Sequence, residues 1–202
     1  AGRRILRRNR KQRRRWPAVL VAAALLVGFA VFALQAVQPD VQKLSYPRKY
    51  ESIVSAQAAE YELEESLVYA VIKAESGFDA EAKSSAGAMG LMQMMPDTFY
   101  WMQTHVGETH DEAALYEPAV SIRFGCAFLS LLLREYGDLT VALCAYNAGM
   151  GNVASWLSDS AYSDDGETLK AIPFGETEAY VQKVLQYKEA YEEIYYGGMK
   201  NG

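Results

Sequence analysis

The sequence predicts an all-α domain that follows an N-terminal transmembrane helix. Apolar residues recur at spacings of three and four in successive segments after residue 50, which is typical of amphipathic helices. No segment of any length alternates between apolar and polar residues, as a half-buried strand would. A charge-free apolar stretch precedes the domain, and 202 residues leave room for one domain and such an appendage.

The first 49 residues divide into three parts. Residues 1–16 contain nine of the twenty basic residues, and no acid occurs before Asp40. Residues 17–38 are long enough to cross a bilayer as a helix, with Trp16 at the interface and the Arg-rich side in the cytoplasm. A cleaved signal peptide is the competing interpretation, although its apolar region would be shorter. Residues 39–49 read as a juxtamembrane linker and residues 50–202 as an extracytoplasmic domain, which predicts a single-pass protein of the cell membrane with the lipid bilayer as a partner.

The net charge and the positions of histidine and cysteine argue against nucleic-acid binding and metal binding. From Asp40 onward eleven basic and twenty-five acidic residues give a net charge of 11 − 25 = −14, which disfavours nucleic-acid binding. The two histidines fall in a polar stretch and the two cysteines, Cys126 and Cys144, in apolar helical segments, so no metal-ligand spacing is present. We therefore expect no metal, no cofactor and two buried free thiols.

Start and stop signals place the helices. Proline begins a helix at 96 and at 118, and glycine follows the ends of helices at 77 and 137. The expected helices cover residues 50–59, 67–76, 96–102, 118–135, 139–144, 153–157 and 176–196, with a polar loop over residues 158–170.

Glu75 is the candidate catalytic group. It ends an apolar helix, where both desolvation and the helix dipole favour the neutral carboxyl group. A glutamate that is protonated near neutral pH can act as a general acid. The alternative is an ordinary solvated residue in the last helical turn.

Four motifs in order resemble the lytic murein transglycosylase family, specifically the catalytic domain of the soluble enzymes, which is related to goose-type lysozyme. They are ESGF at 75–78, GAMGLMQ at 87–93, AYNAG at 145–149 and IPFGETEAYV at 172–181. The resemblance covers about residues 50–191 and implies a lysozyme-like helical fold around a sugar-binding groove. It departs from the family pattern at Ala80, Ser121 and Glu178, which puts fine substrate preference in doubt.

The resemblance also implies a reaction. Peptidoglycan glycan strands would be cut at the β-1,4 bond between N-acetylmuramic acid and N-acetylglucosamine, without water, leaving a 1,6-anhydro ring on the muramic acid. Glu75 would protonate the glycosidic oxygen and then accept the proton of the attacking 6-hydroxyl. A hydrolytic muramidase of the same fold and a non-catalytic peptidoglycan-binding module of an envelope complex stay open as alternatives, and protein partners are unknown.

The resemblance assigns seven further residues to the substrate. Met92 would form an apolar wall and Gln93 would hydrogen-bond sugar. Tyr146 and Asn147 would form the pair beside the acid, and Tyr180 would face it. For Gln93, Asn147 and Tyr180 purely structural roles remain open, as loop ties or core. The full set implied to bind substrate is Ser84, Met92, Gln93, Tyr146, Asn147, Glu176 and Tyr180.

Overall fold

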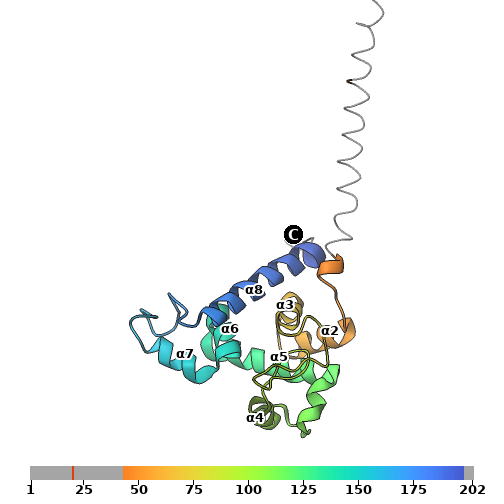
Figure 1. The fold of residues 1–202 in the computed structure, drawn as a ribbon, viewed down its shortest axis with the longest axis horizontal. Helices are drawn as coiled ribbons and strands as arrows, with labels where there is room; N and C mark the ends of the chain where they lie inside the picture. The colour runs from red at the N-terminus through yellow and green to blue at the C-terminus, as the bar shows by residue number, and fades with distance from the viewer. Residues whose placement is uncertain (1–19, 21–42, 198–202) are drawn as a thin grey trace, which may run out of the picture. The chain divides into compact units, whose positions relative to one another are not determined.

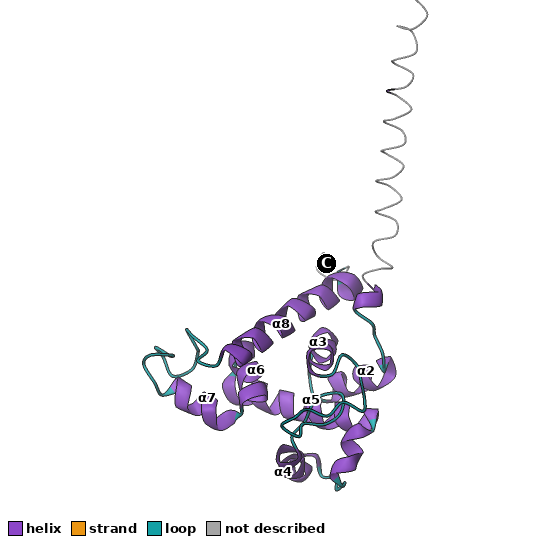
Figure 2. Ribbon diagram, in the orientation of Figure 1, coloured by secondary structure: helices purple, strands orange, loops and turns teal. Residues whose placement is uncertain are grey.

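A computed structural model describes residue 20 and residues 43–197, and Figures 1 and 2 show their arrangement. The chain falls into two units, residues 1–47 and Arg48–Gly202, and every helix labelled in Figure 1 belongs to the second. The described residues contain no named strand, which confirms the all-α expectation for this part of the chain. The helices are α2 (Glu51–Glu60), α3 (Glu65–Glu75), α4 (Pro96–Val106), the 3₁₀ turn η1 (Glu112–Tyr116), α5 (Pro118–Tyr136), α6 (Leu139–Ala148), α7 (Met150–Leu157), α8 (Gly175–Tyr191) and the π turn η2 (Glu192–Tyr196).

The predicted basic arm and most of the predicted membrane segment lie outside the described residues. This holds for residues 1–16, for residues 17–38 apart from residue 20, and for residues 39–42 of the linker. Within residues 43–197, no helix combines the length and apolar character that a membrane span requires.

The predicted proline starts and glycine stops hold. Helices α4 and α5 have Pro96 and Pro118 as their first residues. Gly137 follows α5 with φ 68°, a left-handed conformation that glycine adopts without a steric penalty. The last helix differs from expectation, because its regular part ends at Tyr191 and a π turn carries the chain to Tyr196.

Helix α3 lies at the centre of the fold. All of its residues from Ser66 to Ile72 are buried, since almost its whole surface is apolar. It packs most extensively against α8, while α5 packs against α2, α4 and α6 (Figure 1). Each large aliphatic side chain buried in this way stabilises the domain by about 1.5–3 kcal/mol, so the position of the α3 C-terminus is well determined.

The segment between α3 and α4 folds tightly against the start of α5. A Cβ atom added to Gly90 would lie 1.9 Å from the Leu115 carbonyl oxygen, so only glycine fits there. The buried Ser121 hydroxyl accepts a hydrogen bond from the Met92 amide at 3.2 Å. Ser121 therefore holds this segment on α5.

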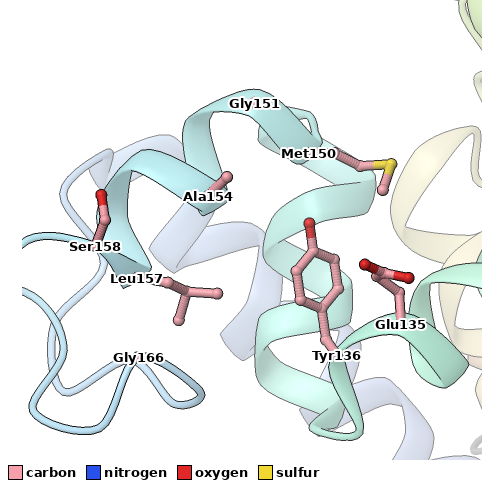
Figure 3. Close-up of a pocket in the computed structure, with 8 residues that line it drawn as sticks. All are labelled: Glu135, Tyr136, Met150, Gly151, Ala154, Leu157, Ser158 and Gly166. Atoms are coloured by element: carbon pink, nitrogen blue, oxygen red, sulfur yellow. The ribbon is translucent and has the colours of Figure 1, made fainter.

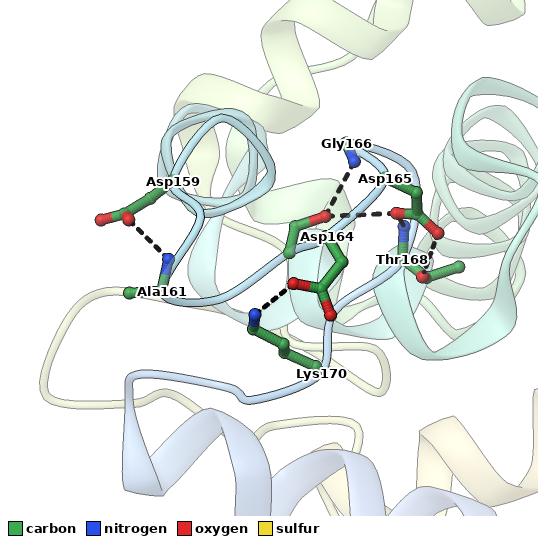
Figure 4. A network of polar contacts seen from close by, with 8 residues as sticks. Asp159, Ala161, Asp164, Asp165, Gly166, Thr168 and Lys170 are labelled. Atoms are coloured by element: carbon green, nitrogen blue, oxygen red, sulfur yellow. Dashed lines mark hydrogen bonds and ion pairs between the residues drawn. The ribbon is translucent and has the colours of Figure 1, made fainter.

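The loop over residues 158–170 is closed by its own hydrogen bonds (Figure 4). Asp165 Oδ1 accepts from the amides of Glu167 and Thr168, both at 2.8 Å, and these bonds hold the pKa of Asp165 well below its usual range. Lys170 pairs with Asp164 in the same loop. The carboxylates of this acidic loop thus organise its backbone.

The two cysteines are free and buried, as expected. Cys126 lies on α5 and Cys144 on α6. Burial raises the pKa of both thiols, that of Cys144 to about 11, so both stay protonated at neutral pH.

Candidate active site

Glu75 is the last residue of α3, and Ser76 fixes the chain that follows it. The Ser76 hydroxyl contacts the Leu91 carbonyl oxygen at 2.8 Å and accepts a hydrogen bond from the Phe78 amide at 3.2 Å. Ser76 therefore joins the end of α3 to the segment that contains Met92 and Gln93. No role was predicted for Ser76 from the sequence, and the structure shows this connection.

The environment of Glu75 favours its neutral form. Burial of the carboxyl group raises the pKa of Glu75 to about 7, and Tyr180 and Lys183 offset part of that rise. Near pH 7 the Glu75 carboxyl group is therefore partly protonated, as a general acid requires.

Two phenol groups lie beside this carboxyl group. Tyr146, on α6, donates a hydrogen bond from its hydroxyl to the Met92 carbonyl oxygen at 2.9 Å. Tyr180, on α8, has a buried hydroxyl that makes no hydrogen bond of normal length to any described residue, yet it lies close enough to affect the pKa of Glu75. Burial and the nearby Glu75 raise the pKa of both tyrosines well above the usual value, so both remain neutral.

Lys183 is a neighbour of Glu75 that sequence reasoning missed. Its ammonium group donates a hydrogen bond to the Ala74 carbonyl oxygen at 3.0 Å, at the C-terminal end of α3, and its charge lowers the pKa of Glu75. The signal was available, because Lys183 follows Tyr180 by three residues and so lies on the same face of α8. A cation at this end also offsets the negative pole of the helix dipole.

The loop residues Ser84 and Gln93 are both bound to backbone. Ser84 Oγ accepts from the Ala88 amide at 2.9 Å. Gln93 Nε2 donates to the carbonyl oxygens of Ala82 and Gly90 at 3.0 and 2.9 Å, and Gln93 has φ 47°. The Gln93 amide nitrogen therefore links two parts of the loop, and its amide oxygen is the group left for a ligand.

The structure corrects the role expected for Met92. Its side chain has 0% exposed surface. It occupies the space that Gly125 leaves on α5, because a Cβ atom added to Gly125 would lie 2.2 Å from the Met92 sulfur atom. The side chain fills a gap against α5 and cannot form an apolar wall for a sugar. Met92 instead contributes its carbonyl oxygen, which orients Tyr146.

Asn147 and Glu176 lie where α6 and α8 meet. The buried Thr177 hydroxyl donates to Asn147 Oδ1 at 2.8 Å, which fixes the amide relative to α8. Glu176 is exposed in the first turn of α8. Sequence reasoning did not single out Thr177, although it lies inside the last motif.

A separate surface cavity of about 620 Å³ lies between the end of α5, α7 and the loop after α7 (Figure 3). Tyr136 and Glu135 line one side, Met150 and Leu157 another, and none of the lining residues belongs to the predicted site. Within the described part of the chain, no group of three or more His, Cys, Asp or Glu side chains is arranged to hold a metal ion.

Comparison with known proteins identifies a family and several relatives of this chain. Residues 52–169 match the family described as "Transglycosylase SLT domain". The soluble lytic murein transglycosylase of Escherichia coli K12 is 32% identical over 160 residues, which are 75% of this chain and 24% of that protein. The membrane-bound lytic murein transglycosylase C of Yersinia enterocolitica is 30% identical over 182 residues, 78% of this chain and 50% of that protein.

A solved structure agrees with the sequence relatives. An inactive mutant of lytic transglycosylase Slt from Pseudomonas aeruginosa superimposes with a TM-score of 0.67 at 34% identity, over 75% of this chain and 25% of that one. The chain therefore spans about a quarter of the length of the first relatives it matches. The order of the motifs, the helical fold around Glu75 and these matches establish that the chain belongs to the transglycosylase SLT-domain family.

Proposed function

We propose that this chain is a membrane-anchored lytic transglycosylase that cuts the β-1,4 bond between N-acetylmuramic acid and N-acetylglucosamine in peptidoglycan. The observation that carries the proposal is a single carboxyl group, Glu75, with a pKa of about 7 and two neutral phenols beside it. Most glycosidases that use water work with two carboxylates that flank the bond. The acidic side chains that follow Glu75 in the loop after α3 are exposed, which favours an intramolecular nucleophile.

In the proposed mechanism Glu75 acts twice. Protonated Glu75 first donates its proton to the glycosidic oxygen as the bond to the anomeric carbon breaks. The resulting carboxylate then accepts the proton of the muramic acid 6-hydroxyl while that oxygen bonds to the anomeric carbon. The product is a 1,6-anhydro sugar, and Glu75 is again protonated for the next cycle.

The surrounding groups would bind and orient the glycan. Gln93 would accept a hydrogen bond through its amide oxygen, because both amide hydrogens are used within the loop. Asn147, held by Thr177, would present its amide at the other side, with Ser84 and Glu176 at the margins. The charge-free segment at 17–38 supports a membrane anchor, and relatives named membrane-bound murein transglycosylases agree with work near a bilayer.

The test is product analysis after incubation of the chain with purified sacculi. We expect muramic acid products that are lighter by one water than those of a hydrolytic muramidase. Products that all carry the added water would replace this proposal with hydrolysis. No release of sugar at all would favour a binding module.

Glu75→Gln provides the matching prediction. Glutamine keeps the shape of the side chain but has no acidic proton, so turnover of sacculi should fall by about a thousandfold. Folding and glycan binding should be retained, as judged by thermal melting and by sedimentation with sacculi. Glu81→Gln, in the exposed loop after α3, is the control and should keep full activity; retained activity in Glu75→Gln would place the acid elsewhere.

A further inference from the structure

Trp101 is an aromatic residue on α4 that the proposed mechanism does not use. Its side chain is 42% exposed, yet neighbouring rings hold it in place. It meets Phe128 edge-to-face, with ring centroids 6.3 Å apart and planes at 89°, and it lies 4.5 Å from the His105 ring. An exposed indole whose orientation is fixed before any ligand arrives can bind a flat surface at low entropic cost.

The ring contacts of Trp101 continue to the acid. Phe128, on α5, lies 5.3 Å from the ring of Tyr146, and Tyr146 stands beside Glu75. Two ring contacts therefore separate the exposed indole from the tyrosine of the site. The row is exposed at Trp101 and almost buried at Phe128, which has 8% exposed surface.

We propose that Trp101 is a stacking platform for a sugar of the glycan strand outside the bond that is cut. This inference rests on the proposed function and extends the same binding site along α4. The faces of a pyranose ring carry C–H groups, which the negative face of an aromatic ring attracts, and a β-1,4-linked strand presents such faces repeatedly. A strand that lies across Glu75 and follows the aromatic row reaches the indole with a sugar face.

The neighbouring residue Tyr100 makes the interpretation testable. It is 47% exposed on the same helix, but its ring contacts Phe99 at 6.0 Å, and no ring contact joins it to Phe128 among the described residues. A general aromatic surface for a membrane would use both residues. The net charge of −14 from Asp40 onward also disfavours the anionic surface of a bilayer.

The experiment measures glycan affinity in the full chain that carries Glu75→Gln, so that binding is not followed by cleavage. The probes are long peptide-free glycan strands and a tetrasaccharide of the same sugars. Trp101→Ala should weaken binding of the long strands about tenfold, a loss typical of a truncated aromatic anchor, and should leave the tetrasaccharide unaffected. Trp101→Phe should retain most of the affinity, and Tyr100→Ala should match the parent for both probes.

Three results would overturn the inference. Equal affinity of Trp101→Ala and its parent for long strands would remove the platform. An equal loss for the tetrasaccharide would show that Trp101 only supports Tyr146 through Phe128. A blue shift of tryptophan emission on phosphatidylglycerol vesicles that is lost in Trp101→Ala, with glycan affinity unchanged in that variant, would assign the surface to a membrane.

The proposed function fails in a different way. If the chain with Glu75 intact releases no anhydro sugar, while the Glu75→Gln chain still binds long strands through Trp101, the reaction is wrong and the platform stands.

Discussion

The hydroxyl groups of Tyr146 and Tyr180 lie beside the same carboxyl group but differ in what they bind. Tyr146 donates to the Met92 carbonyl oxygen, whereas the Tyr180 hydroxyl has no partner of normal hydrogen-bond length among residues 43–197. A buried unpaired hydroxyl destabilises a fold, and such a group is retained where a ligand or a transition state needs it. The two side chains should therefore respond differently to the loss of one oxygen atom.

Tyr146→Phe and Tyr180→Phe test this difference. Tyr146→Phe leaves the Met92 carbonyl unpaired and should lower the free energy of unfolding by about 1 kcal/mol, together with activity. Tyr180→Phe should lower activity about tenfold while the free energy of unfolding stays the same or rises. Urea denaturation and rates on sacculi measure both. A marked loss of stability in Tyr180→Phe would show that this tyrosine serves the core.

Single residues were predictable where local chemistry decides. The apolar helix and the glycine after it indicated the perturbed acid Glu75, and the structure confirms its raised pKa. The partners of Gln93 and Met92 were not predictable, because they depend on how the loop folds back. The left-handed backbone of Gln93 and the space that Gly125 leaves for a thioether decide them. The buried position of Met92 therefore contradicts the expected sugar contact.

Helix α8 crosses the C-terminal end of α3 and brings Lys183 to it. The ammonium group binds a carbonyl oxygen that helix geometry leaves unpaired, and its charge favours the ionised form of Glu75. A general acid loses activity as the pH rises through its pKa. In a plot of kcat/KM against pH, the decrease on the basic side (the basic limb) should therefore be centred near pH 7. Burial sets the raised pKa of Glu75, and the contact between the two helices lowers it in part.

Lys183→Met tests the contact. Without the positive charge the carboxylate is less stable, so the pKa of Glu75 rises and the basic limb moves to higher pH. We expect a shift of about half a unit, because solvent screens an exposed charge. Lys73→Met is the matched control, since Lys73 lies on α3 two residues before Glu75, and helix residues two apart do not face each other. If the basic limb of the pH profile lies at the same pH in Lys183→Met as in the parent, Lys183 does not lower the pKa of Glu75.

Element boundaries were predictable where proline or glycine sets them, as at Pro96, Pro118 and Gly137. The end of α8 was not, because the apolar spacing continues past Tyr191 while the backbone changes to a π turn. Tyr196, the last residue of that turn, contacts Arg48 and Glu65, which are far away in the sequence. Local periodicity carries no information about such contacts.

At the scale of the whole domain, the last turn closes onto the first residues. The Tyr196 hydroxyl donates to Glu65 Oε2 at 2.6 Å, and the Arg48 guanidinium binds the same oxygen at 3.1 Å. Ser55 donates to the other carboxylate oxygen at 2.6 Å. Burial raises the pKa of Glu65, but these hydrogen bonds outweigh it and lower the pKa overall. This cluster of Arg48, Ser55, Glu65 and Tyr196 is remote in sequence from the four family motifs.

Tyr196→Phe should therefore separate stability from catalysis. The lost hydrogen bond to a carboxylate should lower the free energy of unfolding by about 1 kcal/mol, and kcat/KM on sacculi should stay unchanged. Chemical denaturation and initial rates measure the two quantities. Tyr100→Phe, at an exposed position, serves as the control for removal of a phenolic oxygen. A fall in kcat/KM for Tyr196→Phe would instead couple the cluster to the reaction.

Arg48 also lies over the rings of Tyr195 and Tyr196, with its guanidinium carbon 5.3 and 5.6 Å from their centroids. The N-terminal and C-terminal ends of the domain, at Arg48 and Tyr196, thus lie close together in space. A segment with this layout can be spliced into a surface loop of an unrelated host, or circularly permuted by a short connector, without pulling its helices apart. We therefore expect the domain to keep its fold when it is joined to other proteins. This agrees with matches that make up only about a quarter of several longer proteins.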